Sequence, residues 1–160
     1  MLDVPRIWGN LKVTKTVRAP AMTAAELDEY IKGRPFLKDS GYSVPHAAYG
    51  EVHIVQSFDH NSVGISGSVN GPTLMKLTDT VMFLAIRTVI GWDWQIVTTA
   101  LSFNFLRVPK LGDDIRAEAR LMKIGKRTLV SDTNIYAVSQ SEPAVHAMGT
   151  FAVRPYEKKE

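Results

Sequence analysis

The segment between Gly71 and Gly91 predicts a helix that is apolar on most of its sides. Pro72 stands at the first helical position, where proline favours helix initiation. Apolar residues then recur at helical spacing and also occupy other faces: Leu74, Leu77, Val81, Ala85 and Val89, with Met75, Met82, Phe83 and Ile86. Because such a helix has to be buried on most sides, we expect it in the core with a sheet around it.

Four segments after this helix alternate apolar and polar residues with period two: 96–106, 114–124, 128–138 and 144–153. Short links rich in Gly, Pro and Lys separate them, which predicts an antiparallel meander. Residues 51–58 alternate in the same way, whereas residues 41–50 are predicted to be a loop. One long helix between an early strand and four later ones predicts an α+β fold, with a curved antiparallel sheet wrapped around a central helix.

The N-terminal part of the chain carries one clear helix signal. Thr23 and Glu26 have the spacing of a capping box, and Gly33 ends the apolar pattern that follows. We therefore divide the chain into an extension at 1–48 with a short helix and a main domain at 49–155. A chain of 160 residues that is 45% apolar is long enough to bury one substantial core.

The composition excludes several kinds of chemistry. The chain has no Cys, which excludes disulfides, thiolate zinc sites and a cysteine nucleophile. The net charge of +3 is modest and the basic residues are scattered, so a small anionic ligand is a better match than nucleic acid. Without a membrane-length apolar run or a signal-peptide pattern, we expect a cytoplasmic protein. Four histidines show no paired metal-ligand spacing, so no metal is expected: His46, His53, His60 and His146.

Asp79 lies two turns into the most apolar helix, where an unpaired carboxylate is costly to bury. A structural explanation is that it pairs with an Arg, or that Thr78, Asp79 and Thr80 form a solvated strip. The start of the helix favours a catalytic explanation instead. Backbone N–H groups beside Gly71 are unsatisfied and carry the positive end of the helix dipole, so they can hold an oxyanion. Asn70 offers a further amide.

Helix geometry constrains how these groups act together. Gly71 and Asp79 are eight positions apart, which is about 12 Å along a helix that rises about 1.5 Å per residue. One carbonyl group cannot contact both. If the two residues cooperate, Asp79 has to come from a second copy of the chain, which predicts a homodimer with a site at each shared interface.

Residues 50–153 resemble the hotdog-fold acyl-CoA thioesterases of the phenylacetic-acid-degradation type. The resemblance rests on the helix from Gly71 to Asp79, on LSFNFLR followed by a Pro-Lys-Leu-Gly-Asp turn, on GKRT, and on HAMGTFAV. It implies a hotdog fold, a homodimer or homotetramer, and hydrolysis of acyl-CoA to free acid and coenzyme A. No metal or bound cofactor is implied, since coenzyme A belongs to the substrate.

The resemblance also implies residue roles. The N–H of Gly71 would polarise the thioester carbonyl, and Asp79 of the other subunit would act as general base or nucleophile. The family often has His-Gly-Gly where this chain has Asn70, Gly71 and Pro72. Many members place an Asn or Gln upstream, where this chain has Gly64 and, nearby, the possible substitutes Asn61, Ser66 and Ser68.

The ligand would need cations for its phosphates and apolar contacts for its acyl group. Basic residues in or beside two turns are expected to flank the helix start and bind the phosphates: Arg107, Lys110, Lys126 and Arg127. Phe83 is a candidate for the acyl pocket, as are Phe103 and Phe105. Two alternatives stay open: a non-catalytic module that binds acyl-CoA or a protein, and a hotdog hydratase or dehydratase. The latter needs a His near the acid.

Overall fold

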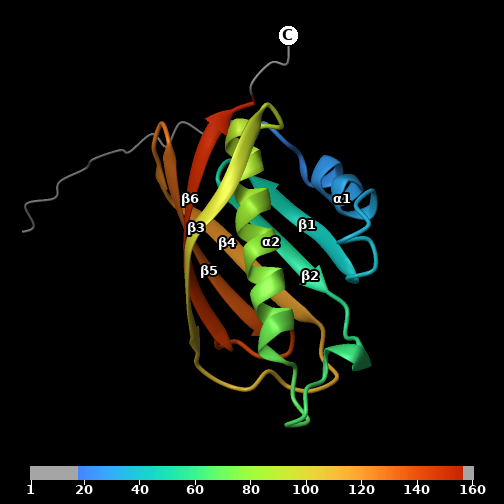
Figure 1. Cartoon of the computed structure of the whole chain (residues 1–160). Helices are drawn as coiled ribbons and strands as arrows, with labels where there is room; N and C mark the ends of the chain where they lie inside the picture. Colours follow the sequence, from blue (N-terminus) through green and yellow to red (C-terminus); the bar gives the residue numbers. More distant parts are fainter. Residues whose placement is uncertain (1–17, 157–160) are drawn as a thin grey trace, which may run out of the picture.

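The computed structural model describes residues 18–156, which form two α-helices and one six-stranded antiparallel sheet (Figure 1). The elements in chain order are α1 (Ala24–Lys32), β1 (Tyr42–Ala48), β2 (Glu51–Gln56), α2 (Gly71–Ile90), β3 (Trp94–Phe105), β4 (Ile115–Ile124), β5 (Thr128–Ala137) and β6 (Val145–Pro155). The curved sheet lies against α2, so the predicted α+β class and the central helix are confirmed. Within these residues no helix is long and apolar enough to span a membrane.

The order of the strands in the sheet is β1-β2-β4-β5-β6-β3. β4, β5 and β6 form a meander, but β3 pairs with β6 and not with β4, so the predicted meander of four strands is wrong. The link at 106–114 passes across the end of the sheet below the start of α2 (Figure 1). Alternation marks a strand but does not select its partner. Because β3 is the last strand in this order, one of its edges is open.

Residues 42–48 are a strand, which corrects the predicted loop at 41–50. β1 and β2 form a hairpin in which His46 pairs with His53 and Ala48 pairs with Glu51. Pro45 lies where the register shifts, and such a position on an edge strand tolerates proline. Weak alternation and this proline concealed the strand. The boundary predicted between 48 and 49 falls at the turn of this hairpin.

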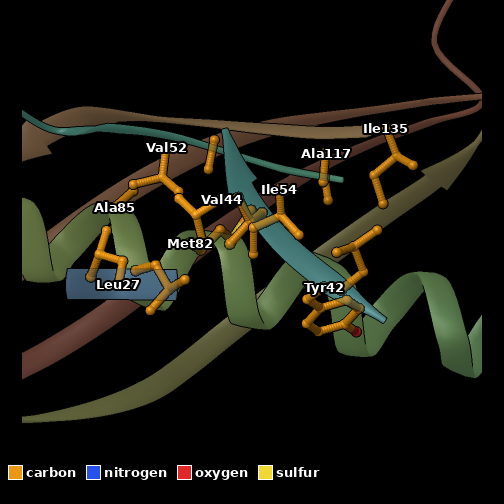
Figure 2. Close-up of a cluster of buried hydrophobic side chains, with 14 of the residues drawn as sticks. Leu27, Tyr42, Val44, Val52, Ile54, Met82, Ala85, Ala117 and Ile135 are labelled. Atoms are coloured by element: carbon orange, nitrogen blue, oxygen red, sulfur yellow. The ribbon is translucent and has the colours of Figure 1, made fainter. Parts of the chain in front are cut away.

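One core joins all elements. Leu77, Val81 and Ala85 of α2 are fully buried, as the helical spacing predicted. Leu27 of α1 lies in the same cluster as Val52 of β2, so α1 is part of the domain (Figure 2). The capping box at Thr23 and Glu26 is confirmed, with both of its hydrogen bonds formed.

Candidate active site at the start of the central helix

Asn70 fixes the start of α2. Its side-chain Oδ1 accepts a hydrogen bond from the backbone N–H of Thr73 at 2.8 Å, which makes it the helix N-cap. Its Nδ2 donates to the backbone oxygen of Ser62 at 2.9 Å, and so does its backbone N–H, at 2.8 Å. The Asn70 side chain therefore holds the preceding loop against the helix. The group that faces a ligand at the helix start is the backbone N–H of Gly71.

Gly71 borders a cavity of about 260 Å³. The lining is mostly apolar and consists of Ser68, Val69, Gly71, Leu74, Phe105, Leu106, Arg107, Val108 and Pro109. Within residues 18–156, no acceptor meets the N–H of Gly71. An unsatisfied donor at the positive end of a long helix, beside an apolar cavity, is suited to bind a carbonyl oxygen that gains negative charge.

Asp79 is half-buried, and its Oδ1 accepts a hydrogen bond from the Thr98 hydroxyl at 3.0 Å. In the described part of the chain no basic side chain lies within ion-pair distance of it, so pairing with a structural Arg is not found. Thr78 and Thr80 are buried and bond back to carbonyls of their own helix, which excludes a solvated strip. The carboxylate is thus held by a neutral partner from β3.

A β-bulge in β3 lets one strand serve both ends of the site. Thr98 pairs with Phe151 and Ala100 with Thr150, which leaves Thr99 as the extra residue. In a regular strand an even and an odd position point to opposite faces. Because of the bulge, Thr98 before it and Phe105 after it both face α2. No pattern in the sequence indicates this bulge, and for that reason Thr98 was not predicted as a site residue.

Gly71 and Asp79 occupy one helix, eight positions apart, and one chain does not bring them to the same ligand atom. Asp79 lies beside β3, which is one of the two edge strands of the sheet. Asp79, for which the sequence predicts a partner group from another chain, is therefore located next to an edge where another chain can pair.

The four predicted phosphate-binding cations separate into two pairs. Arg107 donates to the backbone oxygen of Pro143 at 2.7 Å and contacts Glu142 at 2.8 Å, and Lys110 shares its loop. That loop passes below the start of α2 in Figure 1. Lys126 and Arg127 precede β5, at the opposite end of the sheet, and border a pocket with Trp94. The expectation that all four flank one helix start does not hold within one chain.

Phe83 packs under α1. Its ring stacks on Tyr30, with 6.3 Å between centroids, and the Arg87 guanidinium lies 4.7 Å from its centre. Arg87 is 4% exposed and donates to the carbonyls of Gly91 and Trp94 at the end of α2. Burial lowers the pKa of Arg87, which stays charged. Phe105, which the sequence offered only as one of several aromatic candidates, lies beside Gly71 instead.

The curved antiparallel sheet around a long central helix defines a hotdog fold, and solved structures share it. A thioesterase candidate from a Silicibacter species is 24% identical, with a TM-score of 0.78 over 85% of this chain and 94% of that chain. A Haemophilus influenzae thioesterase is 17% identical, with a TM-score of 0.76 over 87% and 96%. A hypothetical thioesterase from Streptococcus pneumoniae, solved with coenzyme A, is 23% identical, with a TM-score of 0.65 over 73% and 88%.

The sequence itself also matches a family. The model of the thioesterase superfamily matches residues 66–144, which include the loop before α2, all of α2 and the strands from β3 to β5. No curated protein matches the chain. Residues 66–144 are thus similar to the thioesterase superfamily, and the described chain has the hotdog fold that the solved thioesterases share. The phenylacetic-acid-degradation subtype stays a prediction.

Proposed function

We propose that this protein hydrolyses acyl-CoA thioesters to a free acid and coenzyme A. The observation that carries the proposal is the unsatisfied N–H of Gly71 at an apolar cavity, combined with Asp79 on the side of the same helix that faces the open β3 edge. An oxyanion donor and a carboxylate are sufficient to cleave an activated acyl bond.

In the proposed reaction, the thioester oxygen accepts a hydrogen bond from the N–H of Gly71. Asp79 of the partner copy takes a proton from water, whose oxygen attacks the carbonyl carbon, or attacks that carbon itself to form an anhydride that water then cleaves. The negative charge that develops on the carbonyl oxygen is stabilised by the helix N-terminus. Collapse of the tetrahedral intermediate breaks the carbon–sulfur bond and releases coenzyme A as its thiolate.

The proposal requires a homodimer. Two copies that pair their open β3 edges about a twofold axis place two antiparallel α2 helices side by side. Gly71 of one copy then approaches Asp79 of the other. The same axis places Lys126 and Arg127 of one copy at the end of the sheet where the other has Arg107 and Lys110. The four predicted cations become one phosphate-binding group across the interface. Further packing of sheets would give a tetramer.

The cavity beside Gly71 sets the expected ligand class. Leu74 and Phe105 are suited to an apolar acyl chain, and Arg107 lies at the same cavity for a phosphate. Phe83 is a candidate only for a longer acyl chain that follows α2 beyond Asp79. The coenzyme A present in the Streptococcus pneumoniae relative supports this ligand class.

A panel of short, medium, long and aryl acyl-CoAs, assayed by release of free thiol, tests the proposal. We expect turnover of at least one class and its loss in the Asp79→Asn variant, with the fold and the oligomeric state unchanged. Binding of acyl-CoA by both proteins without turnover by either would show a non-catalytic module and overturn the proposal.

A further inference from the structure

Three metal-ligand side chains converge on the hairpin of β1 and β2, away from the candidate active site. Nε2 of His46 lies 3.5 Å from Oε1 of Glu51, and Nε2 of His53 lies 3.3 Å from the same oxygen. The possible ligand atoms of the three residues all lie within 4.8 Å of one another. All three side chains are partly accessible, so an ion can reach them from solvent.

These separations match the edge of a small coordination tetrahedron. Zinc binds imidazole nitrogen and carboxylate oxygen at about 2.0–2.2 Å, which places neighbouring tetrahedral ligand atoms about 3.3–3.5 Å apart. The two distances to Glu51 Oε1 fall at these values. Two imidazoles and one carboxylate are also a donor set that zinc and its neighbouring transition metals accept.

The backbone holds this arrangement in place. His46 and His53 are directly opposite each other in the hairpin, and their rings lie 4.6 Å apart. Gly50 in the turn has a φ of +75°, donates from its N–H to the buried Thr88 hydroxyl at 2.8 Å and accepts from Leu121 at 2.7 Å. A turn anchored to both α2 and β4 keeps the three ligands close without an ion, which reduces the entropy lost on binding.

An open cavity beside the cluster leaves room for a further ligand. It has a volume of about 240 Å³ and is lined by Glu51, His53, Glu118, Ala119, Arg120, Asp132 and Asn134. Val52 and Ile54 alternate with the two β2 ligands and are buried against the core that contains α2. The cluster therefore lies on the outer face of the sheet, and the inference does not depend on the proposed hydrolysis.

We propose that His46, Glu51 and His53 bind one divalent transition-metal ion, zinc in the first instance, with water as the fourth ligand in the adjacent cavity. This differs from the expectation drawn from the sequence, which found no metal-ligand spacing among the histidines. His46 and His53 are seven positions apart, and only the register of a strand that had been predicted as a loop brings them together.

Titration of the tag-free, chelator-treated full chain with Zn²⁺ in a calorimeter tests the proposal. We expect one ion per chain. Glu51→Gln and His53→Gln each remove one ligand and should weaken Zn²⁺ binding at least about tenfold. Loss of a residue that only hydrogen-bonds to a metal ligand already lowers metal affinity by about that factor. His60→Gln is the matched control, since His60 is an accessible histidine outside the cluster, and its affinity should equal that of the unmodified chain.

Co²⁺ gives a second readout that does not depend on folding stability. Tetrahedral Co²⁺ absorbs visible light, and this absorption should appear with the unmodified chain and the His60→Gln variant but not with Glu51→Gln. Circular dichroism checks that each variant is folded. Absence of Zn²⁺ binding by the unmodified chain, or equal binding by Glu51→Gln, would overturn the proposal.

Discussion

The Thr98 hydroxyl donates a hydrogen bond to the Asp79 carboxylate, with 3.0 Å between Oγ1 and Oδ1. This bond joins the central helix to β3, whose outer edge is open, and it orients one oxygen of the proposed catalytic acid. It is also the contact by which β3, immediately before its bulge, fixes the position of that acid.

Thr98→Val removes this hydrogen bond and keeps the shape of the side chain. We expect a fall in kcat of about tenfold, since a hydrogen bond to a charged group contributes about 1.5–3 kcal/mol and this one is partly exposed. KM should stay the same, because Thr98 positions the acid and does not hold the substrate. Thr99→Val is the matched control, since the Thr99 hydroxyl bonds to the Thr150 backbone at 3.0 Å. Equal rates for the two variants would contradict the role given to Thr98.

Gly71→Ala separates catalysis from folding. A methyl group at this position would lie 3.7 Å from Cζ of Phe105, an ordinary contact, and alanine favours a helix more than glycine does by about 1 kcal/mol. Thermal unfolding should therefore show equal or higher stability. The methyl group obstructs the approach of a carbonyl to the N–H, and we expect kcat/KM to fall by about 10²–10³, the usual effect of losing an oxyanion donor. An unchanged kcat/KM would exclude Gly71 from the site.

Mixed dimers test whether the two groups come from different chains. Asp79→Asn and Gly71→Ala should each be nearly inactive alone. The two variants are co-expressed with different affinity tags, and each mixed dimer would contain one intact site of its two. Because random mixing makes half of the dimers mixed, the sample should recover about a quarter of the unmodified activity. A site built within one chain would leave every mixed dimer inactive. Light scattering on the same samples measures the oligomeric state.

Gly149→Ala should destabilise the domain. A Cβ at this buried position in β6 would lie 2.6 Å from the Met82 sulfur and 2.7 Å from Cε2 of Phe151. Overpacking of this kind costs about 1–3 kcal/mol, which urea unfolding at a fixed protein concentration would show as a lower midpoint. Gly33→Ala is the control, because its nearest contact would be an ordinary 3.5 Å. Similar midpoints for both variants would contradict the close packing of α2 on β6.

The amino-acid sequence alone determined the elements whose signals are local. The helix between Gly71 and Gly91 was predicted to within a residue, because proline at its start and a helical apolar pattern both act within a few positions. The short helix after Thr23 was predicted for the same reason, through its capping box. The separation of Gly71 and Asp79 along one helix followed from helix geometry without any knowledge of the sheet.

Pairing between distant strands was decided only by the tertiary structure. β3 lies beside β6 and not β4, and a bulge at Thr99 turns both Thr98 and Phe105 toward α2. Hairpin register brought His46 of β1 together with Glu51 and His53 of β2, and the alternation in β1 was too weak to predict that strand. Alternation along a strand fixes which side chains share a face, but the partner and the register depend on packing across the whole sheet, which no local pattern encodes.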